Sequence, residues 1–385
     1  MLANTGRIDH ESSAAVARDL PCVEAELDRF YPRRLEPDQL EWWVPGDSLG
    51  SADRPGLAER LERSIIAPVR ETIDAGGHRW RPALAAQAVA LLGGDVERFA
   101  PILAAMEIAH TGSLIVDDVE DEAVLRRGRP AAHVVHGMPT ALNAGTNAYF
   151  ALDIALRRTL PDHAPLRGRI SEAYVEALRA AHTGQALDIQ GHHAEMEHAV
   201  STGDSSALLD VVRLTHRLKS GLIAGAALEM GGLSTGAGPE VCRALGDFGT
   251  AVGTAYQITD DVADLSGVTR RGKPTKRPAE DLHNAKVTMP LAHCVGRLPA
   301  PRLRAVWEAM RSGDAPQHEI ELAREAIEEC GAPGVCEAEA RTMLEDSWNR
   351  LRPLLPDAPA TERFRERAFH YVLAGLDARA ADSSG

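Results

Sequence analysis

Segments rich in alanine and leucine recur at helical spacing along most of this chain of 385 residues. They begin at about Leu57, and stretches such as 82–92 and 100–116 are separated by short breaks of glycine, proline or aspartate. Apolar positions three or four residues apart are typical of helices that bury one face, whereas strands need an alternation that is scarce here. The sequence therefore predicts an all-α fold.

The two ends of the chain differ in composition from this helical region. Residues 1–56 contain several prolines and the pair Trp42 and Trp43, and we interpret them as an N-terminal extension that packs on the main domain. Residues 57–372 are expected to form that main domain. The small polar residues of 373–385 are expected to form a flexible tail.

Charge and cysteine content narrow the classes of function. The 42 basic and 56 acidic side chains give a net charge of −14, which argues against a nucleic-acid surface or a basic membrane-binding patch. The five cysteines are scattered, without the spacing of a zinc site or a disulfide framework. The N-terminus lacks the apolar core of a signal peptide, and no apolar run reaches about 18 residues. We therefore expect a cytoplasmic protein that is not inserted in a membrane.

The pattern Asp-Asp-x-x-Asp occurs twice, at 117–121 and at 260–264, each time after an apolar stretch that reads as helix. Positions i and i+4 share a helical face with i+1 beside them, so each motif projects two or three carboxylates from one patch. Mg²⁺ ions would offset the repulsion within such a patch, and Mg²⁺ is typically held by one or two carboxylates together with substrate phosphates. The doubled motif therefore indicates one polyanion held by metal.

Basic and polar residues lie near both motifs in the sequence. Arg126 and Arg127 follow the first motif, and His110 precedes Asp117 by nearly two helical turns, which places it on the same face. Guanidinium groups bind phosphate oxygens in a bidentate way. The remaining groups of this kind are His78, Arg81, Lys219, Ser220, Gln257, Lys273 and Lys286. Three further histidines, His192, His193 and His198, form no ligand pattern and are interpreted as surface residues.

Taken together, these motifs resemble the trans-prenyl diphosphate synthase (polyprenyl synthetase) family. The resemblance spans about 70–290 and rests on Gly-Gly-x-Arg-x-Arg-Pro at 76–82, the two aspartate motifs, Leu-Arg-Arg-Gly at 125–128 and the Lys219-Ser220 pair, in family order. The blocks 117–150 and 182–185 most closely resemble geranylgeranyl diphosphate synthases of the fungal and animal type.

The resemblance implies an activity and an assembly. It implies an all-α isoprenoid synthase fold around a central cavity, usually as a homodimer. It also implies a trans-prenyltransferase that condenses an allylic diphosphate with isopentenyl diphosphate, with Mg²⁺ as cofactor and three ions bound with the diphosphate. Such chemistry requires electrostatic stabilisation of the departing pyrophosphate rather than a protein nucleophile.

By resemblance, the residues named above take specific roles. The expected Mg²⁺ ligands are Asp117, Asp121 and Asp260, with Asp118, Asp261 and Asp264 as direct or supporting ligands. The allylic diphosphate would contact Arg126, Lys219, Ser220, Gln257, Lys273 and Lys286. The diphosphate of isopentenyl diphosphate would contact His78, Arg81, His110 and Arg127. The catalytic set would comprise Asp117, Asp118, Asp121, Asp260, Asp261 and Lys219.

Two positions depart from the usual family pattern. His78 stands where the family usually has lysine, and it is reliably cationic only where its site favours the protonated form. Binding of isopentenyl diphosphate would then be weaker or more dependent on pH. Ser220 replaces the usual threonine and keeps the hydroxyl, so we expect little consequence.

The length of the product is predicted from the helix that carries Asp117. One turn before it lie Gly112 and Ser113, which are small, so the bulky stop of short-chain enzymes is absent. An alternative for Gly112 is that it allows close helix packing. Tyr149, Phe150 and His182 match positions that close the tunnel in geranylgeranyl-type relatives. The expected product is geranylgeranyl diphosphate (C20), although C25 stays open.

Two other functions are compatible with parts of the pattern. A class I terpene cyclase also ionises an allylic diphosphate but needs no isopentenyl diphosphate, and His78 is the feature in its favour. Its second metal motif is usually of the Asn/Ser/Glu type, unlike 260–264. A non-catalytic regulatory subunit of another synthase would be expected to have lost metal ligands, and both aspartate motifs are intact here.

Overall fold

The computed structural model describes residues 20–44, 46–50, 52–77, 79–270, 273–276, 278–312 and 316–382. Helices make up nearly all of their regular structure, and the strands among them form two short antiparallel hairpins. This confirms the predicted all-α class. The chain divides into two compact units, Met1–Ser171 and Glu172–Gly385, and the division falls inside one long helix, α10 (Ala164–Gln190).

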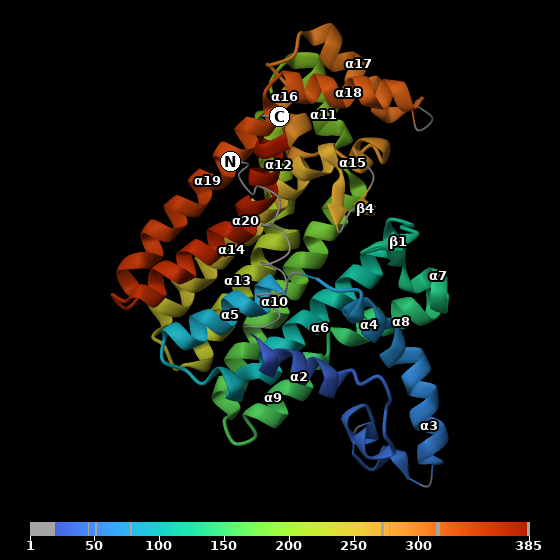
Figure 1. Ribbon diagram of the computed structural model, residues 1–385, viewed down its shortest axis with the longest axis vertical. Coiled ribbons are helices and arrows are strands. Elements are labelled where there is room, and N and C mark those ends of the chain that lie inside the picture. Colours follow the sequence, from blue (N-terminus) through green and yellow to red (C-terminus); the bar gives the residue numbers. More distant parts are fainter. Residues whose placement is uncertain are drawn as a thin grey trace, which may run out of the picture. The chain divides into compact units, whose positions relative to one another are not determined.

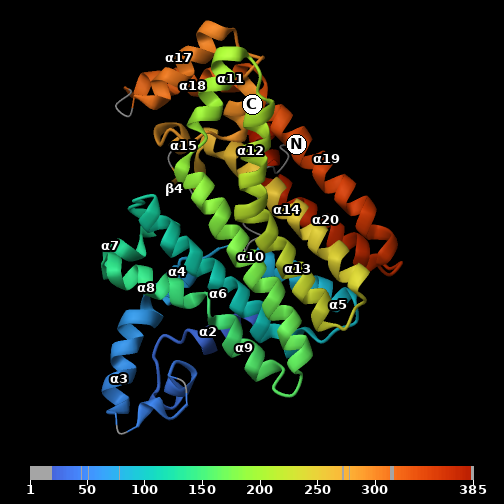
Figure 2. The same ribbon diagram turned by 180° about the vertical axis from the view of Figure 1, so that it is seen from behind.

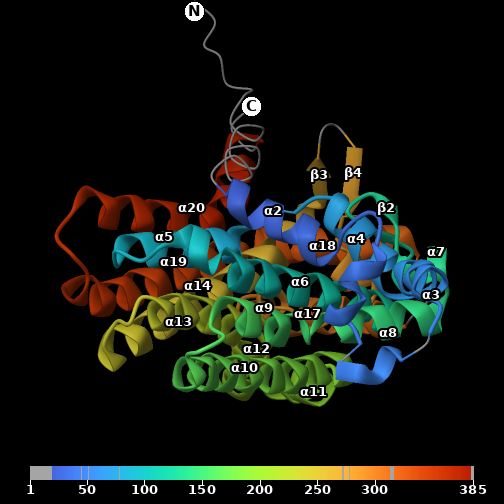
Figure 3. The ribbon, with the colours of Figure 1, turned by 90° about the horizontal axis from the view of Figure 1, so that it is seen from below.

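Unit 1 is organised around the 25-residue helix α6 (Val96–Glu120), against which five helices of eight residues or more pack, together with the shorter α7 (Ala132–His136) (Figures 1 and 3). The five longer helices are α2 (Pro21–Phe30), α4 (Ala67–Asp74), α5 (Trp80–Leu91), α8 (Met138–Ala148) and α9 (Ala151–Thr159). The other elements are η1 (Pro37–Trp42), η2 (Gly46–Leu49), α3 (Arg54–Leu61), the π-helical turn η3 (Glu62–Ile66), β1 (Leu125–Arg126) and β2 (Arg129–Pro130). The central place of α6 brings its last turn, with the first aspartate motif, close to the β1–β2 hairpin.

The sequence of α6 accounts for its length and its burial. The side chain of Asp95 caps its start by accepting a hydrogen bond of 3.0 Å from the backbone of Arg98. Small and apolar side chains such as Ala104, Ala105 and Ile108 are fully buried. Among the described helices, α6 alone is long and apolar enough to cross a membrane, but 72% of its apolar window is buried inside the structure. It is a core helix that ends in a cluster of carboxylates.

In unit 2, the 28-residue helix α14 (Pro239–Ser266) has α13 (Leu222–Ser234), α19 (Ala332–Leu351) and α20 (Pro359–Asp382) along its sides (Figures 1 and 2). The rings of Phe248, Trp348 and Phe364 join three of these helices, with centroids 5.5 to 6.3 Å apart. The other elements are α11 (His193–Thr202), α12 (Ser206–His216), the π-helical turn η4 (Arg217–Gly221), β3 (Val268–Arg270), β4 (Lys273–Lys276), α15 (Glu280–His283), α16 (Met289–Cys294), α17 (Ala300–Arg311), α18 (Gln317–Glu329) and η5 (Arg352–Leu354).

A close approach between η4 and α14 fixes the position of Lys219 and Ser220 relative to the helix that carries the second aspartate motif. A Cβ atom at Gly253 would lie 2.6 Å from the carbonyl oxygen of Ser220, so a side chain larger than hydrogen would push the two elements apart. One turn further along α14, Gln257 accepts a hydrogen bond of 2.8 Å from the hydroxyl of Ser220. The π-helical turn is thereby fastened to the helix that carries the second aspartate motif.

Residues 20–31 contribute to the core of unit 1. Helix α2 packs on α6, and the guanidinium of Arg70 lies 2.6 Å from the carboxylate of Asp28 on α2. Two aromatic pairs, Phe30 with Trp42 and Tyr31 with Trp43, have ring centroids 6.0 and 5.3 Å apart. The domain boundaries at 56 and 373 stay predictions; α3 extends across the first, and α20 continues past the second to Asp382.

Candidate active site

The first aspartate motif is fastened to the hairpin that follows it. Arg126, on β1, donates from Nε to Oδ1 of Asp118 at 2.7 Å and lies 3.2 Å from Oδ2 of Asp117. Asp118 is 1% exposed, and burial raises the pKa of its carboxyl although Arg126 opposes this effect. Asp117 is half-buried and Asp121 is exposed. The motif therefore presents two more accessible carboxylates, of which Asp117 also contacts Arg126, beside the buried carboxylate of Asp118.

A cluster of cationic groups lies between α4 and α6 in the same unit. Arg127 donates to the carbonyl oxygens of Thr72 and Gly76. Nη1 of Arg81 lies 3.3 Å from Nε2 of His110. Because a guanidinium can only donate, Nε2 of His110 accepts and its proton is on Nδ1. Partial burial and the guanidiniums of Arg81 and Arg127 lower the pKa of this imidazole well below its ordinary value.

These contacts bring together three of the four residues predicted to hold isopentenyl diphosphate, namely Arg81, His110 and Arg127. The fourth, His78, lies outside the described residues. A neutral imidazole surrounded by guanidiniums gains favourable interactions when an anion arrives, because the anion stabilises its protonated form. The cluster is therefore chemically suited to a diphosphate, and this suitability does not depend on His78.

Arg79 anchors the start of α5, the helix that carries Arg81. It has left-handed backbone geometry, with φ of 50°, and its side chain is 8% exposed. Its guanidinium lies 2.8 Å from the buried carboxylate of Glu107 and 3.2 Å from Glu24, and it donates to the carbonyl of Ile73 at 2.9 Å. The sequence prediction assigned Arg79 no role. Its partners come from α2 and α6, so local sequence could not reveal the network.

The second aspartate motif, at the end of α14, also has buried members bound by the protein. Oδ2 of Asp261 accepts from the backbone nitrogen of Met289, at the start of α16, at 3.0 Å and lies 3.3 Å from Nε2 of His216. Oδ2 of Asp264 accepts from the backbone nitrogen of Asp281 at 3.0 Å. These two carboxylates are 5% and 1% exposed, whereas Asp260 is exposed.

Two of the predicted diphosphate contacts converge on one carboxylate in unit 2. Nζ of Lys219, on the π-helical turn, lies 2.7 Å from Oδ2 of Asp188, and Nζ of Lys286 lies 3.8 Å from the same atom. Ser220 is bound to Gln257, as described above. The structure thus brings Lys219 together with Lys286 and Ser220 with Gln257. Lys273 lies on β4, and its side chain is not among those described.

The donor set fits Mg²⁺ but not a protein-only metal cage. Among the described residues, no group of three histidine, cysteine or acidic side chains is arranged to hold a metal ion. Carboxylate oxygens are the ligands that Mg²⁺ prefers, and it commonly takes only one or two from the protein. Asp117, Asp121 and Asp260 are the accessible aspartates of the motifs. Each of these carboxylates is of a kind suited to bind Mg²⁺ together with phosphate oxygens.

The residues predicted to set product length lie in different environments. Gly112 is at the crossing of α6 and α8, where a Cβ atom would overlap the carbonyl oxygen of Gly145 and lie 2.7 Å from Cβ of Ala148. This supports the alternative interpretation of Gly112, in which its small size allows close helix packing. Ser113 is half-buried and donates to the carbonyl of His110 at 2.8 Å.

The three residues predicted to close a tunnel also differ from one another. Burial, with smaller contributions from Glu120 and Asp117, raises the pKa of Tyr149 to about 12. Phe150, at the start of α9, is 70% exposed, which does not suit a side chain that lines a buried wall within a single chain. His182, on α10, is exposed and its Nδ1 lies 2.8 Å from the carbonyl oxygen of Leu178.

Sequence reasoning missed other buried polar residues of unit 2. His192, interpreted as a surface residue, is 5% exposed, and its Nε2 lies 3.2 Å from the hydroxyl of Thr215. His216, the last residue of α12, is 8% exposed and contacts Asp261. Burial lowers the pKa of His216, but the carboxylate of Asp261 outweighs this effect, so the pKa is raised. Only the packing of α12 against its neighbours reveals this arrangement.

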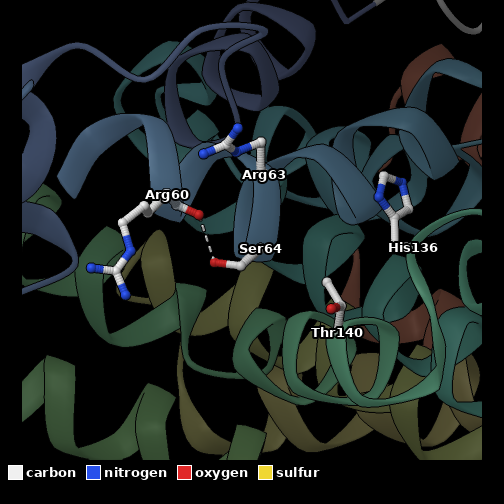
Figure 4. Close-up of a pocket in the computed structure, with 5 residues that line it drawn as sticks. All are labelled: Arg60, Arg63, Ser64, His136 and Thr140. Carbon is white, nitrogen blue, oxygen red and sulfur yellow. Dashed lines mark hydrogen bonds between the residues drawn. The ribbon is translucent and has the colours of Figure 1, made fainter. Parts of the chain in front are cut away.

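One pocket of unit 1 is not lined by the residues predicted to bind diphosphate. It has a volume of about 360 Å³ and lies beside η3 (Figure 4). Its lining residues are Arg60, Arg63, Ser64, His136 and Thr140. The two guanidinium groups point in different directions, and no motif aspartate is among the lining residues described. A smaller pocket of about 150 Å³ lies beside the β1–β2 hairpin and includes Glu71, Thr72 and Arg126.

Comparisons with known proteins show which family this sequence resembles. The sequence model of the polyprenyl synthetase family matches residues 62–327. The chain is 32% identical over 306 residues to geranylfarnesyl diphosphate synthase of Aeropyrum pernix, covering 78% of this chain and 90% of that protein. It is 29% identical over 304 residues to a short chain isoprenyl diphosphate synthase of Methanothermobacter thermautotrophicus, covering 78% and 88%.

Solved structures give the same result for the fold. A polyprenyl synthase from Caulobacter crescentus, complexed with calcium and isoprenyl diphosphate, matches with a TM-score of 0.71 and 26% identity, covering 94% of this chain and 97% of that one. A geranylgeranyl pyrophosphate synthetase from Pyrococcus horikoshii shares the fold, with a TM-score of 0.73, 22% identity and coverage of 94% and 98%. The chain therefore belongs to the polyprenyl synthetase family, and its enzymatic class is trans-prenyltransferase.

Proposed function

We propose that this protein is a Mg²⁺-dependent synthase that condenses an allylic diphosphate with isopentenyl diphosphate to give geranylgeranyl diphosphate (C20). One observation carries the proposal: each aspartate motif has buried members bound by the protein and accessible members beside them. Such a division suits a site that must keep its shape while it binds and releases a metal–diphosphate complex.

The aspartates would divide the work of metal binding. Asp117, Asp121 and Asp260 would hold the metal, whereas the buried Asp118, Asp261 and Asp264 would keep the motifs in place. Bound Mg²⁺ would stabilise the negative charge that develops on the departing pyrophosphate. The contacts from Arg126 to Asp118 and from Met289 to Asp261 support the positioning role.

The cationic groups would bind the two substrates. Arg126, Lys219 and Lys286, with Ser220, Gln257 and Lys273, would bind the allylic diphosphate. Arg81, His110 and Arg127, with His78, would bind isopentenyl diphosphate. In the reaction the allylic carbon–oxygen bond breaks, the alkene of isopentenyl diphosphate attacks the cation to form a carbon–carbon bond, and a proton passes to the released pyrophosphate. The arginine and lysine side chains in these two sets are positively charged, which suits the binding of a diphosphate.

The names of the relatives do not determine the length of this protein's product, so our proposal for it rests on residues of this chain. Their names include short-chain, geranylgeranyl and geranylfarnesyl synthases, so family membership is compatible with several lengths. We propose that Tyr149 and His182 limit elongation and that Ser113 leaves room for it; Phe150 would contribute only if something covers its exposed ring. We further propose that the protein is a cytoplasmic homodimer. Size-exclusion chromatography with light scattering tests whether it is a dimer.

One assay separates the proposed synthase from its two rivals. Purified protein is incubated with Mg²⁺ and farnesyl diphosphate, with and without isopentenyl diphosphate, and the products are separated by chromatography. A longer diphosphate that requires both substrates supports the synthase. Hydrocarbon formed without isopentenyl diphosphate would instead identify a terpene cyclase. Absence of turnover with farnesyl, geranyl and dimethylallyl diphosphates alike would identify a non-catalytic subunit.

A further inference from the structure

Two cysteines of unit 2 lie in contact and have no role in the proposed reaction. Cys294 is the last residue of α16, and Cys330 is the C-cap of α18, directly before α19. Their Sγ atoms are 3.5 Å apart, although 36 residues separate them in the sequence. All five cysteines lie in the described part of the chain, and none of them forms a disulfide. The fold therefore brings two of them into direct contact.

The two thiols have unequal surroundings. Cys294 is fully buried and its Sγ lies 3.3 Å from the carbonyl oxygen of Pro290, whereas Cys330 is half-buried. The hydrogen bond from Cys294, with the backbone N–H of Ala332 and the charge of Arg297, lowers the pKa of Cys330 to about 6. The N-terminus of the 20-residue helix α19 also favours a negative charge at this place.

We propose that Cys330 is a site of covalent modification by low-molecular-weight disulfides and that Cys294 is its resolving thiol. The Cys330 thiolate attacks one sulfur of glutathione disulfide, whose S–S bond breaks and releases one glutathione. The contact with Cys330 and burial raise the pKa of Cys294. As Cys294 attacks the Cys330 sulfur, its proton therefore passes to the departing glutathione thiolate, which leaves as the second glutathione. The protein loses two electrons and two protons, and one glutathione disulfide becomes two glutathione molecules.

The geometry suits both steps. The attacking thiolate is the more accessible member of the pair, and the second thiol is already beside it. A disulfide needs the Sγ atoms to approach to about 2 Å, so the present distance of 3.5 Å must shorten by roughly 1.5 Å. The product would join α16 to the junction of α18 and α19. This inference is independent of the proposed function, because it concerns thiol chemistry alone.

Cys22 provides a matched comparison within the chain. It is also half-buried, but burial raises its pKa, so it has little thiolate at neutral pH. At about pH 7, Cys330 should react with iodoacetamide at least ~10-fold faster than Cys22, because reactivity follows the thiolate fraction, only partly offset by weaker nucleophilicity. Alkylation followed by peptide mass spectrometry measures both rates in the same sample. Equal rates would contradict the assignment of Cys330 as the reactive thiol.

The decisive experiment treats the reduced, full-length protein with glutathione disulfide and measures intact mass. The wild type should lose about 2 Da and yield a cross-linked peptide pair containing Cys294 and Cys330. Cys294→Ser should instead retain one glutathione on Cys330, because the resolving thiol is gone. Cys330→Ser should not form the cross-link, and Cys242→Ser should behave as the wild type.

Circular dichroism of each variant, compared with the wild type, establishes whether it is folded before it is scored. A wild type that does not form the cross-link would overturn the proposal. So would a Cys294→Ser variant that is folded but acquires no glutathione. A cross-link between Cys330 and Cys336, the buried cysteine of α19, would overturn the assignment of Cys294 as the resolving thiol.

Discussion

Nε of Arg126 lies 2.7 Å from Oδ1 of Asp118, so the most buried carboxylate of the first motif is neutralised by the hairpin that follows it. Asp117, the preceding residue, also lies within reach of the same guanidinium, at 3.2 Å, but is half-buried. Adjacent aspartates of the motif thus have different surroundings. We expect them to respond differently to substitution.

Asp118→Asn should lower the free energy of unfolding by about 2 kcal/mol, because it leaves a partly buried guanidinium without its main counter-charge. Asp117→Asn should change stability by less than about 1 kcal/mol but reduce kcat/KM at least ~100-fold and raise the Mg²⁺ requirement. Urea unfolding and Mg²⁺ titrations of the initial rate measure the two effects. Equal losses of stability in both variants would contradict the distinction.

The buried ion pair between Arg79 and Glu107 should contribute to the stability of unit 1. Glu107→Gln removes a carboxylate that is 2% exposed and 2.8 Å from the guanidinium, and we expect a loss of about 3 kcal/mol. Asp153→Asn provides the control, because its pair with Arg157 is exposed to solvent and should contribute little to stability. Urea unfolding compares them. A Glu107→Gln variant as stable as the control would show that Arg79 is held by its other contacts.

The lowered pKa of His110 predicts a loss of stability in acid. Below about pH 6.5 the unfolded chain takes up a proton at this imidazole while the folded protein does not, so stability falls as the pH drops. In His110→Gln this contribution is absent. Between about pH 7.5 and 5.5, the wild type should therefore lose about 1 kcal/mol more than the variant. His182→Gln, which replaces an exposed histidine, should lose as much stability as the wild type over this pH range. A larger loss in His110→Gln than in the wild type would contradict the prediction.

Gly112→Ala should act on packing rather than on product length. The added Cβ atom would meet the backbone of α8, and overpacking of this kind costs typically about 1–3 kcal/mol. Any residual activity should give the wild-type product distribution. Chromatography of the products and thermal unfolding test this together. A shorter product from a variant of unchanged stability would restore the chain-length role of this position.

Tyr149→Ala should lengthen the product beyond C20, because it removes a largely buried ring at the end of α8. Phe150→Ala is the matched variant: it removes a ring that is 70% exposed and should leave the product unchanged in a monomer. If both variants lengthen the product equally, Phe150 must be covered in the active enzyme. Mass spectrometry of the dephosphorylated products distinguishes these outcomes.

The sequence predicted the features that depend on local pattern. Helical class follows from apolar periodicity, and the aspartate motifs lie at helix ends as expected. The partners of buried polar groups were not predictable, because packing brings them from distant positions. Asp188 meets Lys219 across 31 residues, and Arg79 meets Glu107 across 28. Gly112 shows the same limit, since a small residue that opens space and one that permits contact look identical in sequence.

Asp188 is a counterion for Lys219 and is also near Lys286. An arriving anion must compete with this carboxylate for the two ammonium groups. A monophosphate brings less charge than a diphosphate and so recovers less of the interaction that it displaces. Asp188 therefore favours ligands that carry more negative charge. A diphosphate should displace it from the two lysines more readily than a monophosphate does.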